Sequence, residues 1–273
     1  MIKTCLSDLD RTVTVIVNVY NGEDYIGDCL NSICSQTHKE LQILVCDNHS
    51  TDRTLLLVKD INDSRITLIQ PPYHVNLYAA RQYTLSYRSG RYLMFLDADD
   101  MWLPEKVSST LALHERSNCT IAYSNFYYRS ESKSFVAFTS PQISGTNIGS
   151  KVASDYKVGL LTLSIDTHKL PKNSLFFDKY YEIVGDFEFV LRLLFMGCSL
   201  HYDNEPHAIC RIRLESLSNS RQLRWSRELL HWLFVNYKNL LPKHIVRIVF
   251  YSCYLLLIYC KTYISKYMRS IKF

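Results

Sequence analysis

The chain has 273 residues, of which 47% are hydrophobic and 21% are charged, so it is long enough for one globular catalytic domain and an additional segment. The formal net charge is only +5 and Lys and Arg form no long run before the C-terminal end, which argues against a nucleic-acid-binding protein. The nine cysteines include no Cys-x-x-Cys pair and predict buried free thiols in a reducing compartment. The first ten residues carry acids and lack the apolar core of a signal peptide, which predicts a cytoplasmic protein.

Apolar, β-branched runs alternate with segments of helical periodicity through the first 120 residues, a pattern typical of a parallel sheet flanked by helices. Strands are expected at residues 14–19, 41–46, 66–69 and 92–96, with helices near 26–34, 52–60 and 77–87 between them. In such a sheet the ligand crevice lies beyond the carboxyl ends of the strands. Polar residues follow these strand ends, and we expect them to converge: Asn18 to Asn21, Asp47 and Asn48, and Asp97 to Asp100.

The pattern loosens after Pro104, with shorter apolar runs at residues 121–128 and 135–138. The polar stretch from Ser140 to Ser154 contains two glycines and is expected to be a mobile loop. Helical spacing returns at 187–194, a final strand is expected at 207–212, and the chain beyond Ser220 is helical in pattern. We therefore predict a catalytic domain over residues 1–218 and a helical extension over residues 219–273.

The acidic block Asp97-Ala98-Asp99-Asp100 directly follows a strand that reads as buried. Carboxylates this close raise one another's pKa unless a cation offsets their charge. A hard divalent ion is usually held by one or two carboxylates together with substrate phosphates. The block therefore predicts a protein that acts on a metal-bound phosphate ester.

The order of the polar motifs resembles that of the family 2 glycosyltransferases with the GT-A fold, over roughly residues 12–218. Any one of the motifs is weak alone, whereas their order along the chain is specific. The segments that carry the resemblance are Val17 to Asn21, Asp47 to Thr54, Ala80-Arg81, Ser89 to Tyr92, Leu96 to Asp100 with Trp102 and Pro104, Gly185 to Leu193, and Cys210 to Arg213 before Ser216-Leu217-Ser218. The resemblance implies an α/β fold with a Rossmann-like, mostly parallel sheet.

The resemblance also implies an inverting, metal-dependent transfer of a sugar from a nucleoside-diphosphate donor, most simply a UDP-sugar, to a hydroxyl group of a glycan or lipid-linked saccharide. Asp99 would bind Mn²⁺ or Mg²⁺ directly, and Asp97 would face the ribose or support the ion. Arg81 would contact or support the donor phosphates. The residues implied for the donor's base are Asn18, Tyr20, Asp47 and Asn48.

Asp186 matches the family's general base, with Glu188 as the alternative base. Its position at the start of a predicted helix also suits a carboxylate that only stabilises the helix N-terminus. Gly185 stands where the family often has Glu, and Arg213 stands where many members have His. Arginine cannot ligate a metal, so we expect Arg213 to pair with the donor diphosphate instead.

These two departures keep a second hypothesis open, a catalytically idle protein that binds a nucleotide or acts as a membrane scaffold. A phosphatase with an Asp nucleophile is a third hypothesis. It is disfavoured because its Asp-x-Asp motif would follow the first strand, whereas the motif here follows the fourth.

The C-terminal extension is apolar and basic. Its apolar run from Ile248 to Cys260 is shorter than the roughly 20 residues of a membrane-spanning helix. An apolar stripe precedes the run, at Leu229, Leu230, Leu233, Phe234 and Tyr237. The basic residues around it are Lys243, Arg247, Lys261, Lys266, Arg269 and Lys272. We expect a helix on the anionic inner face of the cell membrane, where it would meet a polyprenyl-diphosphate-linked acceptor of bacterial surface-polysaccharide assembly; packing on the catalytic domain or on a second subunit is the alternative.

Overall fold

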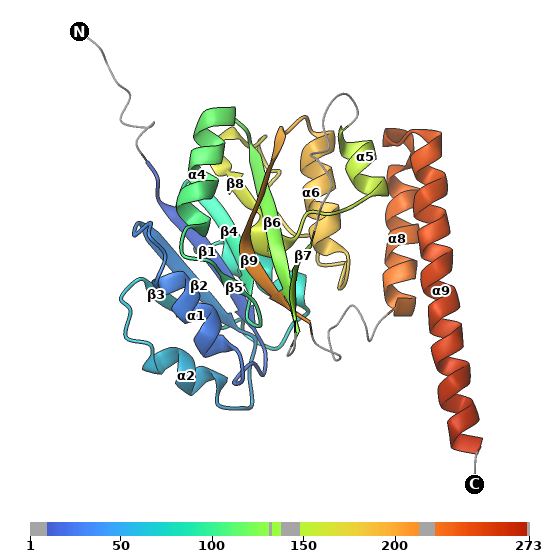
Figure 1. Cartoon of the computed structure of the whole chain (residues 1–273), viewed down its shortest axis with the longest axis horizontal. Coiled ribbons are helices and arrows are strands. Elements are labelled where there is room, and N and C mark those ends of the chain that lie inside the picture. Colours follow the sequence, from blue (N-terminus) through green and yellow to red (C-terminus); the bar gives the residue numbers. More distant parts are fainter. Residues whose placement is uncertain (1–9, 131–132, 138–147, 213–221, 272–273) are drawn as a thin grey trace.

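The computed structural model describes residues 10–130, 133–137, 148–212 and 222–271, with residues 258–271 described as backbone only. Its centre is a nine-stranded sheet in the order β3-β2-β1-β4-β8-β6-β9-β5, with β7 paired to β6 (Figure 1). The strands are β1 (Val13–Val19), β2 (Leu41–Asp47), β3 (Ile66–Ile69), β4 (Tyr92–Asp97), β5 (Met101–Trp102), β6 (Ile121–Arg129), β7 (Ser134–Val136), β8 (Ser164–Asp166) and β9 (Leu200–Arg211).

The first four strands are mutually parallel and match the predicted strands to within about one residue at each end. Every residue of β1 is buried, since both faces of this part of the sheet are covered. Val15 and Val17 belong to the core beneath α1 (Ile26–Cys34), whereas Ile16 belongs to the core on the opposite face. The prediction of a mostly parallel sheet flanked by helices is confirmed.

The second half of the sheet is mixed. β8 runs antiparallel to both β4 and β6, and β9 runs parallel to β6 with register shifts near Asn125. β9 begins at Leu200 instead of residue 207, because its polar first half pairs with β6 despite carrying no apolar alternation. The remaining helices are α2 (Thr54–Asp60), α3 (Leu77–Leu85), α4 (Lys106–Ser117), α5 (Ile148–Ser154), α6 (Gly185–Phe195), α8 (Gln222–Asn236) and α9 (Pro242–Ile271).

The loop predicted from Ser140 to Ser154 is wrong in its second part, where residues 148–154 form α5. Gly149 packs so closely on α6 that a Cβ atom there would lie 2.7 Å from the Phe195 ring. Val152 and Ala153 are buried, and the Ser150 hydroxyl accepts a hydrogen bond from Leu241 N (3.0 Å). Tertiary contacts therefore make this polar segment helical; residues 140–147 lie outside the described part of the chain.

The helices α8 and α9 lie side by side along one flank of the domain, next to α5 and α6 (Figure 1). The predicted stripe on α8 divides: Leu229 and Leu233 are buried, whereas Leu230 and Phe234 are exposed. Trp232 fills the contact with α6, with its ring centroid 4.7 Å from that of Phe187. None of the helices in the described segments combines the length and apolar content of a membrane-spanning helix.

Candidate active site

The carboxyl ends of β1, β2 and β4 bring the predicted polar residues together. Asn18 is aligned with Asp97 on β4, and its neighbour Val19 is aligned with Asp47 on β2. The side chain of Asn18 is buried, and neither its nitrogen nor its oxygen has a hydrogen-bond partner among the described residues. A buried amide without partners is unusual in a folded protein, and a bound water molecule or ligand is one way to satisfy it.

Asp47 and Asn48 build the wall next to this amide. The buried Asp47 carboxylate accepts a hydrogen bond from Gln70 Nε2 (2.8 Å), and the Asn48 side chain bonds the backbone of Val75 through both its nitrogen (2.8 Å) and its oxygen (3.1 Å). Both side chains thus fix the segment that follows β3. They therefore support the residues that face the site.

Tyr20 and His74 form the exposed surface of this wall. Their ring centroids lie 4.6 Å apart, and His74 Nδ1 lies 2.8 Å from the Asn48 carbonyl oxygen. Half of Tyr20 is open to solvent. Two aromatic rings at the end of the sheet make a surface on which a planar base can stack. No motif in the sequence marks His74, which reaches the site only because Asn48 holds its loop.

The acidic block forms a tight turn at the end of β4, in which Asp100 N donates to the Asp97 carbonyl oxygen (2.9 Å). Asp97 and Asp99 are half-buried, whereas Asp100 is buried and accepts a hydrogen bond from Arg211 N (3.0 Å). Burial raises the pKa of Asp100, and the charges of Asp99 and Asp97 raise it further. Asp100 therefore supports the turn, while Asp97 and Asp99 give it its negative potential.

The two half-buried carboxylates fit a hard divalent cation that takes its other oxygen ligands from a bound diphosphate. Among the residues that the structure describes, no three His, Cys, Asp or Glu side chains are grouped to hold a metal by themselves. Arg213, predicted to pair with the diphosphate, lies outside the described residues. Its neighbour Arg211 forms an ion pair with Asp28 (2.5 Å).

Arg81 links the acidic turn to the predicted base. Its guanidinium is only 3% exposed and forms an ion pair with Asp97. Burial lowers the pKa of Arg81, but the negative charges around it, chiefly Asp97, keep this pKa above its ordinary value. The same guanidinium attracts the Asp186 carboxylate, so one buried cation interacts with both acids.

Asp186 lies in the first turn of α6 and faces Tyr78 of α3. Its Oδ1 atom accepts a hydrogen bond from Phe187 N (2.8 Å) and lies 3.2 Å from the Tyr78 hydroxyl. Burial raises the pKa of Asp186, and Asp97 raises it further, whereas Arg81 and the two hydrogen-bond donors oppose the rise. A carboxyl group with a raised pKa is better suited to accept a proton than an ordinary surface Asp.

Glu188, the alternative base, is engaged elsewhere, because its carboxylate pairs with Arg192 (2.7 Å). Tyr78 was not predicted as a site residue, although its position three residues before Arg81 places both on one face of α3. Sequence patterns also did not mark Glu228 of α8. Its buried carboxylate accepts hydrogen bonds from the backbone nitrogens of Glu182 (3.0 Å), Ile183 (2.9 Å) and Val184 (3.2 Å), directly before α6.

Asp186 opens onto a cavity of about 550 Å³ between the start of α6 and the helices α8 and α9. Aromatic side chains provide much of its wall, among them Tyr156 and Trp225. The lining of this cavity includes Asp186 but none of the residues of the acidic turn, Asp97 to Asp100. The cavity is therefore a second place, apart from the turn, where a reactant can meet the Asp186 carboxylate.

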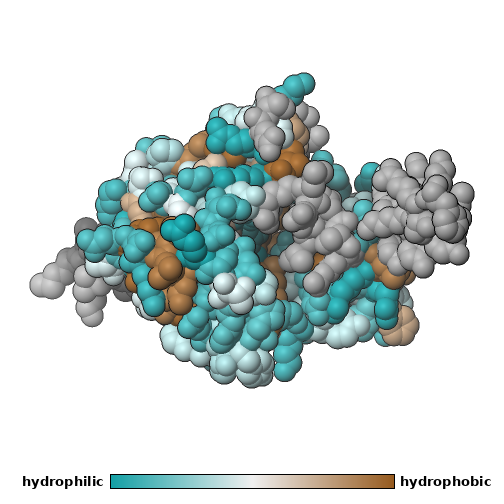
Figure 2. All heavy atoms as spheres, turned by 90° about the horizontal axis from the view of Figure 1, so that it is seen from below, coloured by the Kyte–Doolittle hydropathy of each residue, from teal (hydrophilic) through white to brown (hydrophobic). Residues whose placement is uncertain are grey.

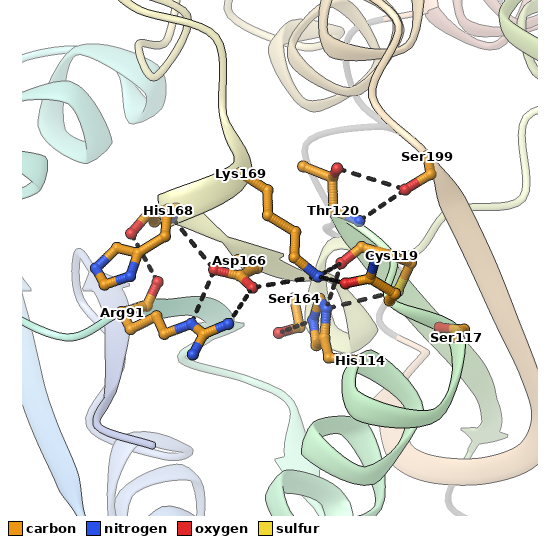
Figure 3. A network of polar contacts seen from close by, with 12 residues as sticks. Arg91, His114, Ser117, Cys119, Thr120, Ser164, Asp166, His168, Lys169 and Ser199 are labelled. Atoms are coloured by element: carbon orange, nitrogen blue, oxygen red, sulfur yellow. Dashed lines mark hydrogen bonds and ion pairs between the residues drawn. The ribbon is translucent and has the colours of Figure 1, made fainter. Parts of the chain in front are cut away.

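A second polar network lies at the opposite end of β4 from the acidic turn (Figure 3). The buried Asp166 pairs with Arg91 (2.8 Å) and Lys169 (3.6 Å), and it is aligned with Tyr92 at the start of β4. His114 beside it contacts Ser164 Oγ (3.0 Å), and burial lowers its pKa to about 4. This network joins β4, β8 and α4 at the amino end of β4, away from the acidic turn, and is structural.

Comparison with known proteins agrees with this geometry. The family model described as glycosyl transferase family 2 matches residues 14–179. The chain is 32% identical over 157 residues to "UDP-Glc:alpha-D-GlcNAc-diphosphoundecaprenol beta-1,3-glucosyltransferase WfgD" of Escherichia coli, covering 58% of this chain and 61% of that protein. It is 36% identical over 129 residues to WfaP of the same species, which has the same descriptive name, covering 47% of this chain and 51% of that protein. The chain thus matches less than two thirds of the length of either relative.

Solved structures share the fold. Residues 1–349 of TarS from S. aureus, in complex with UDP-GlcNAc, superpose with a TM-score of 0.68 at 20% identity, covering 87% of this chain and 70% of that one. The mannosyltransferase PcManGT from Pyrobaculum calidifontis, in complex with GDP-Man and Mn²⁺, gives a TM-score of 0.62 at 17% identity, covering 89% and 69%. The family match gives no support to the phosphatase hypothesis. The chain belongs to glycosyl transferase family 2 and has the GT-A fold of that family.

Proposed function

We propose that this protein transfers a sugar from a UDP-sugar, with inversion, to a hydroxyl group of a saccharide linked to polyprenyl diphosphate, in the assembly of a bacterial surface polysaccharide. The observation that carries the proposal is the pairing of Asp97 with Arg81, beside a base of raised pKa at Asp186. The names of the relatives WfgD and WfaP support the donor and the acceptor class.

The donor would lie across the ends of β1, β2 and β4. Tyr20 and His74 would stack on its base, and the unpaired amide of Asn18 would hydrogen-bond it, with Asp47 and Asn48 holding the wall behind them. Arg213 would pair with the diphosphate. Asp99, assisted by Asp97, would hold Mn²⁺ or Mg²⁺, which when bound neutralises the charge that develops on the leaving nucleoside diphosphate.

Asp186 would accept the proton of the acceptor hydroxyl. As that oxygen forms a bond to the anomeric carbon, the bond from this carbon to the diphosphate oxygen breaks, and its electron pair leaves with UDP. A single displacement inverts the anomeric carbon, so an α-linked donor gives a β-linked product. Tyr78 and the Phe187 amide orient the carboxylate, and Arg81 stabilises its ionised form.

The helices α8 and α9 would hold the protein at the inner face of the cell membrane. The face of the molecule in Figure 2 is mainly hydrophilic with separate hydrophobic patches. On α8 and α9, by contrast, large apolar side chains are strongly exposed, with Phe234 at 79% and Phe250 at 75%. Lys243 lies on the same helix as Phe250 and would face anionic headgroups.

The proposal is tested by thermal unfolding with UDP, GDP, CDP or dTDP, each with and without Mn²⁺, together with an assay of transfer. A ligand that binds only the folded state stabilises it by about 2.7 kcal/mol at a hundredfold excess over its Kd. We expect a shift with UDP that depends on Mn²⁺ and disappears in Asp99→Ala, and a product with an inverted anomeric centre. Binding of UDP without turnover of any UDP-sugar would support the idle scaffold instead.

A further inference from the structure

We infer that the cavity beside Asp186 is the acceptor site, that Arg247 of α9 binds the acceptor's diphosphate, and that the lipid leaves along Val246 and Phe250. The inference rests on the proposed function and adds to it a defined place for each part of the acceptor. The evidence is the order in which chemical groups line the cavity from the base outward.

The cavity extends from the base to the surface of α9. A second hollow of about 350 Å³ shares Ser154, Arg247 and Tyr251 with the cavity of Asp186, so the two adjoin. The second hollow adds Val246 and Phe250 to the wall. Arg247 therefore lies between the end that contains the base and the end that contains exposed apolar side chains.

The inner end suits a saccharide. The ring of Tyr156 packs on Phe187, with centroids 5.1 Å apart, and its buried hydroxyl has no hydrogen-bond partner among the described residues. Trp225 of α8 also lines the cavity. Aromatic faces beside a free hydroxyl group are the surface that a sugar ring requires, since its faces are partly apolar and its edge is polar.

The middle of the cavity suits a diphosphate. Arg247 is exposed, and no described residue forms an ion pair or hydrogen bond with it. Lys157, which pairs with Asp155 (3.2 Å), also lines the cavity and contributes a second cation. Burial lowers the pKa of the neighbouring His244, and the charges of Lys243 and Arg247 lower it further, so the region is electropositive. A guanidinium binds phosphate oxygens through two parallel hydrogen bonds.

The outer end suits a hydrocarbon chain. Val246 is 67% exposed, and Phe250 lies one turn further along α9. A water-soluble glycan has neither a phosphate group to pair with Arg247 nor a hydrocarbon chain to contact the apolar side chains. An acceptor with a saccharide, a diphosphate and a lipid in that order matches the cavity: the saccharide would lie beside the base, the diphosphate beside Arg247 and the lipid along the apolar side chains.

The test compares two acceptors on the full chain in detergent. One carries α-GlcNAc linked through a diphosphate to a phenoxyundecyl group, and the other carries α-GlcNAc linked directly to the same group. We expect Arg247→Gln to raise KM for the first acceptor roughly tenfold or more and to leave KM for the second within about twofold, because one charge-assisted contact is lost. Lys243→Gln, one turn earlier on α9, is the matched control and should change each value by no more than about twofold, because Lys243 adds charge near the cavity but does not line it.

Calorimetric binding of the diphosphate acceptor separates this inference from the proposed function. Tight binding that weakens in Arg247→Gln but gives no turnover in the wild type would contradict the proposed function alone. Turnover with equal KM and Kd in Arg247→Gln and Lys243→Gln would contradict the inference alone. If Arg247 served only the membrane surface, both variants would weaken binding to phosphatidylglycerol vesicles equally while KM in detergent stayed constant, and the inference would again fail.

Discussion

Gly185 directly precedes the proposed base, and its hydrogen atom occupies a place that no larger side chain can take. A Cβ atom built there would lie 2.6 Å from two atoms of the Tyr78 ring, whereas ordinary contacts begin at 3.4 Å. The difference, 3.4 − 2.6, means that Gly185→Ala must separate ring and helix by about 0.8 Å. The same ring leaves no room at this position for the Glu that the resemblance to the family leads us to expect.

The Tyr78 ring cannot yield easily. It is buried, the Arg81 guanidinium carbon lies 5.2 Å from its centroid, and its hydroxyl lies 3.0 Å from the Ile183 carbonyl oxygen. Overpacking of this kind destabilises a protein by roughly 1–3 kcal/mol. A displacement of about 1 Å at a catalytic group can cost about a hundredfold in rate, so we expect kcat to fall ten- to a hundredfold.

Urea unfolding and steady-state kinetics of Gly185→Ala, Tyr78→Ala and the double variant would measure the effect. Because the clash is absent without the ring, the double variant should be more stable than the sum of the two single losses predicts, by roughly 1–2 kcal/mol. The UDP-induced thermal shift should persist in Gly185→Ala, since the donor wall does not include this residue. Wild-type stability and kcat in Gly185→Ala would refute the reasoning.

Other predictions concern ionisable groups. Because burial raises the pKa of Asp186, kcat/KM should fall as the pH decreases through a pKa above the ordinary value of about 3.9. Asp186→Asn should lower kcat by about 10²–10⁴-fold and remove this acidic limb of the pH profile. Burial lowers the pKa of Lys106 from 10.5 to about 7, so the burial of its charged form lowers the free energy of unfolding most at and below pH 7. Lys106→Met should therefore raise the melting temperature at pH 7. At pH 10 the same variant should lower the melting temperature, because it has lost the hydrogen bonds to Thr110 and Thr162. Asp166→Asn should lower the free energy of unfolding by roughly 3 kcal/mol in urea titrations, because it removes the buried carboxylate that pairs with Arg91, without changing the affinity for UDP.

The parts of the fold that the sequence predicts well are those with a local signal. The four parallel strands are continuous apolar runs, and their ends fix the places of Asn18, Asp47 and Asp97. The helix α5 and the first half of β9 have no such signal, because long-range contacts determine their conformation: Gly149 against Phe195, and a polar strand against β6.

The same distinction holds within the candidate site. Asp186 was predicted from its motif. Its burial, which raises its pKa, depends on other elements of the fold. Tyr78 and Arg81 reach it from α3, more than a hundred residues earlier in the chain. A pattern along the sequence carries no information on such pairs, so the sequence predicts the proposed base but not its environment.

The helical extension belongs to this environment. Glu228 of α8 receives three consecutive backbone N–H groups from residues 182–184, and Arg224 holds its carboxylate in place (2.9 Å). A buried carboxylate bonded in this way fixes the backbone immediately before Gly185 and thereby the start of α6. The helices proposed to contact the membrane therefore also position the proposed base and line part of its cavity. The same pair of helices would thus dock the protein on the lipid surface and align the acceptor hydroxyl with Asp186. This double role would account for the close packing of the extension on the catalytic domain.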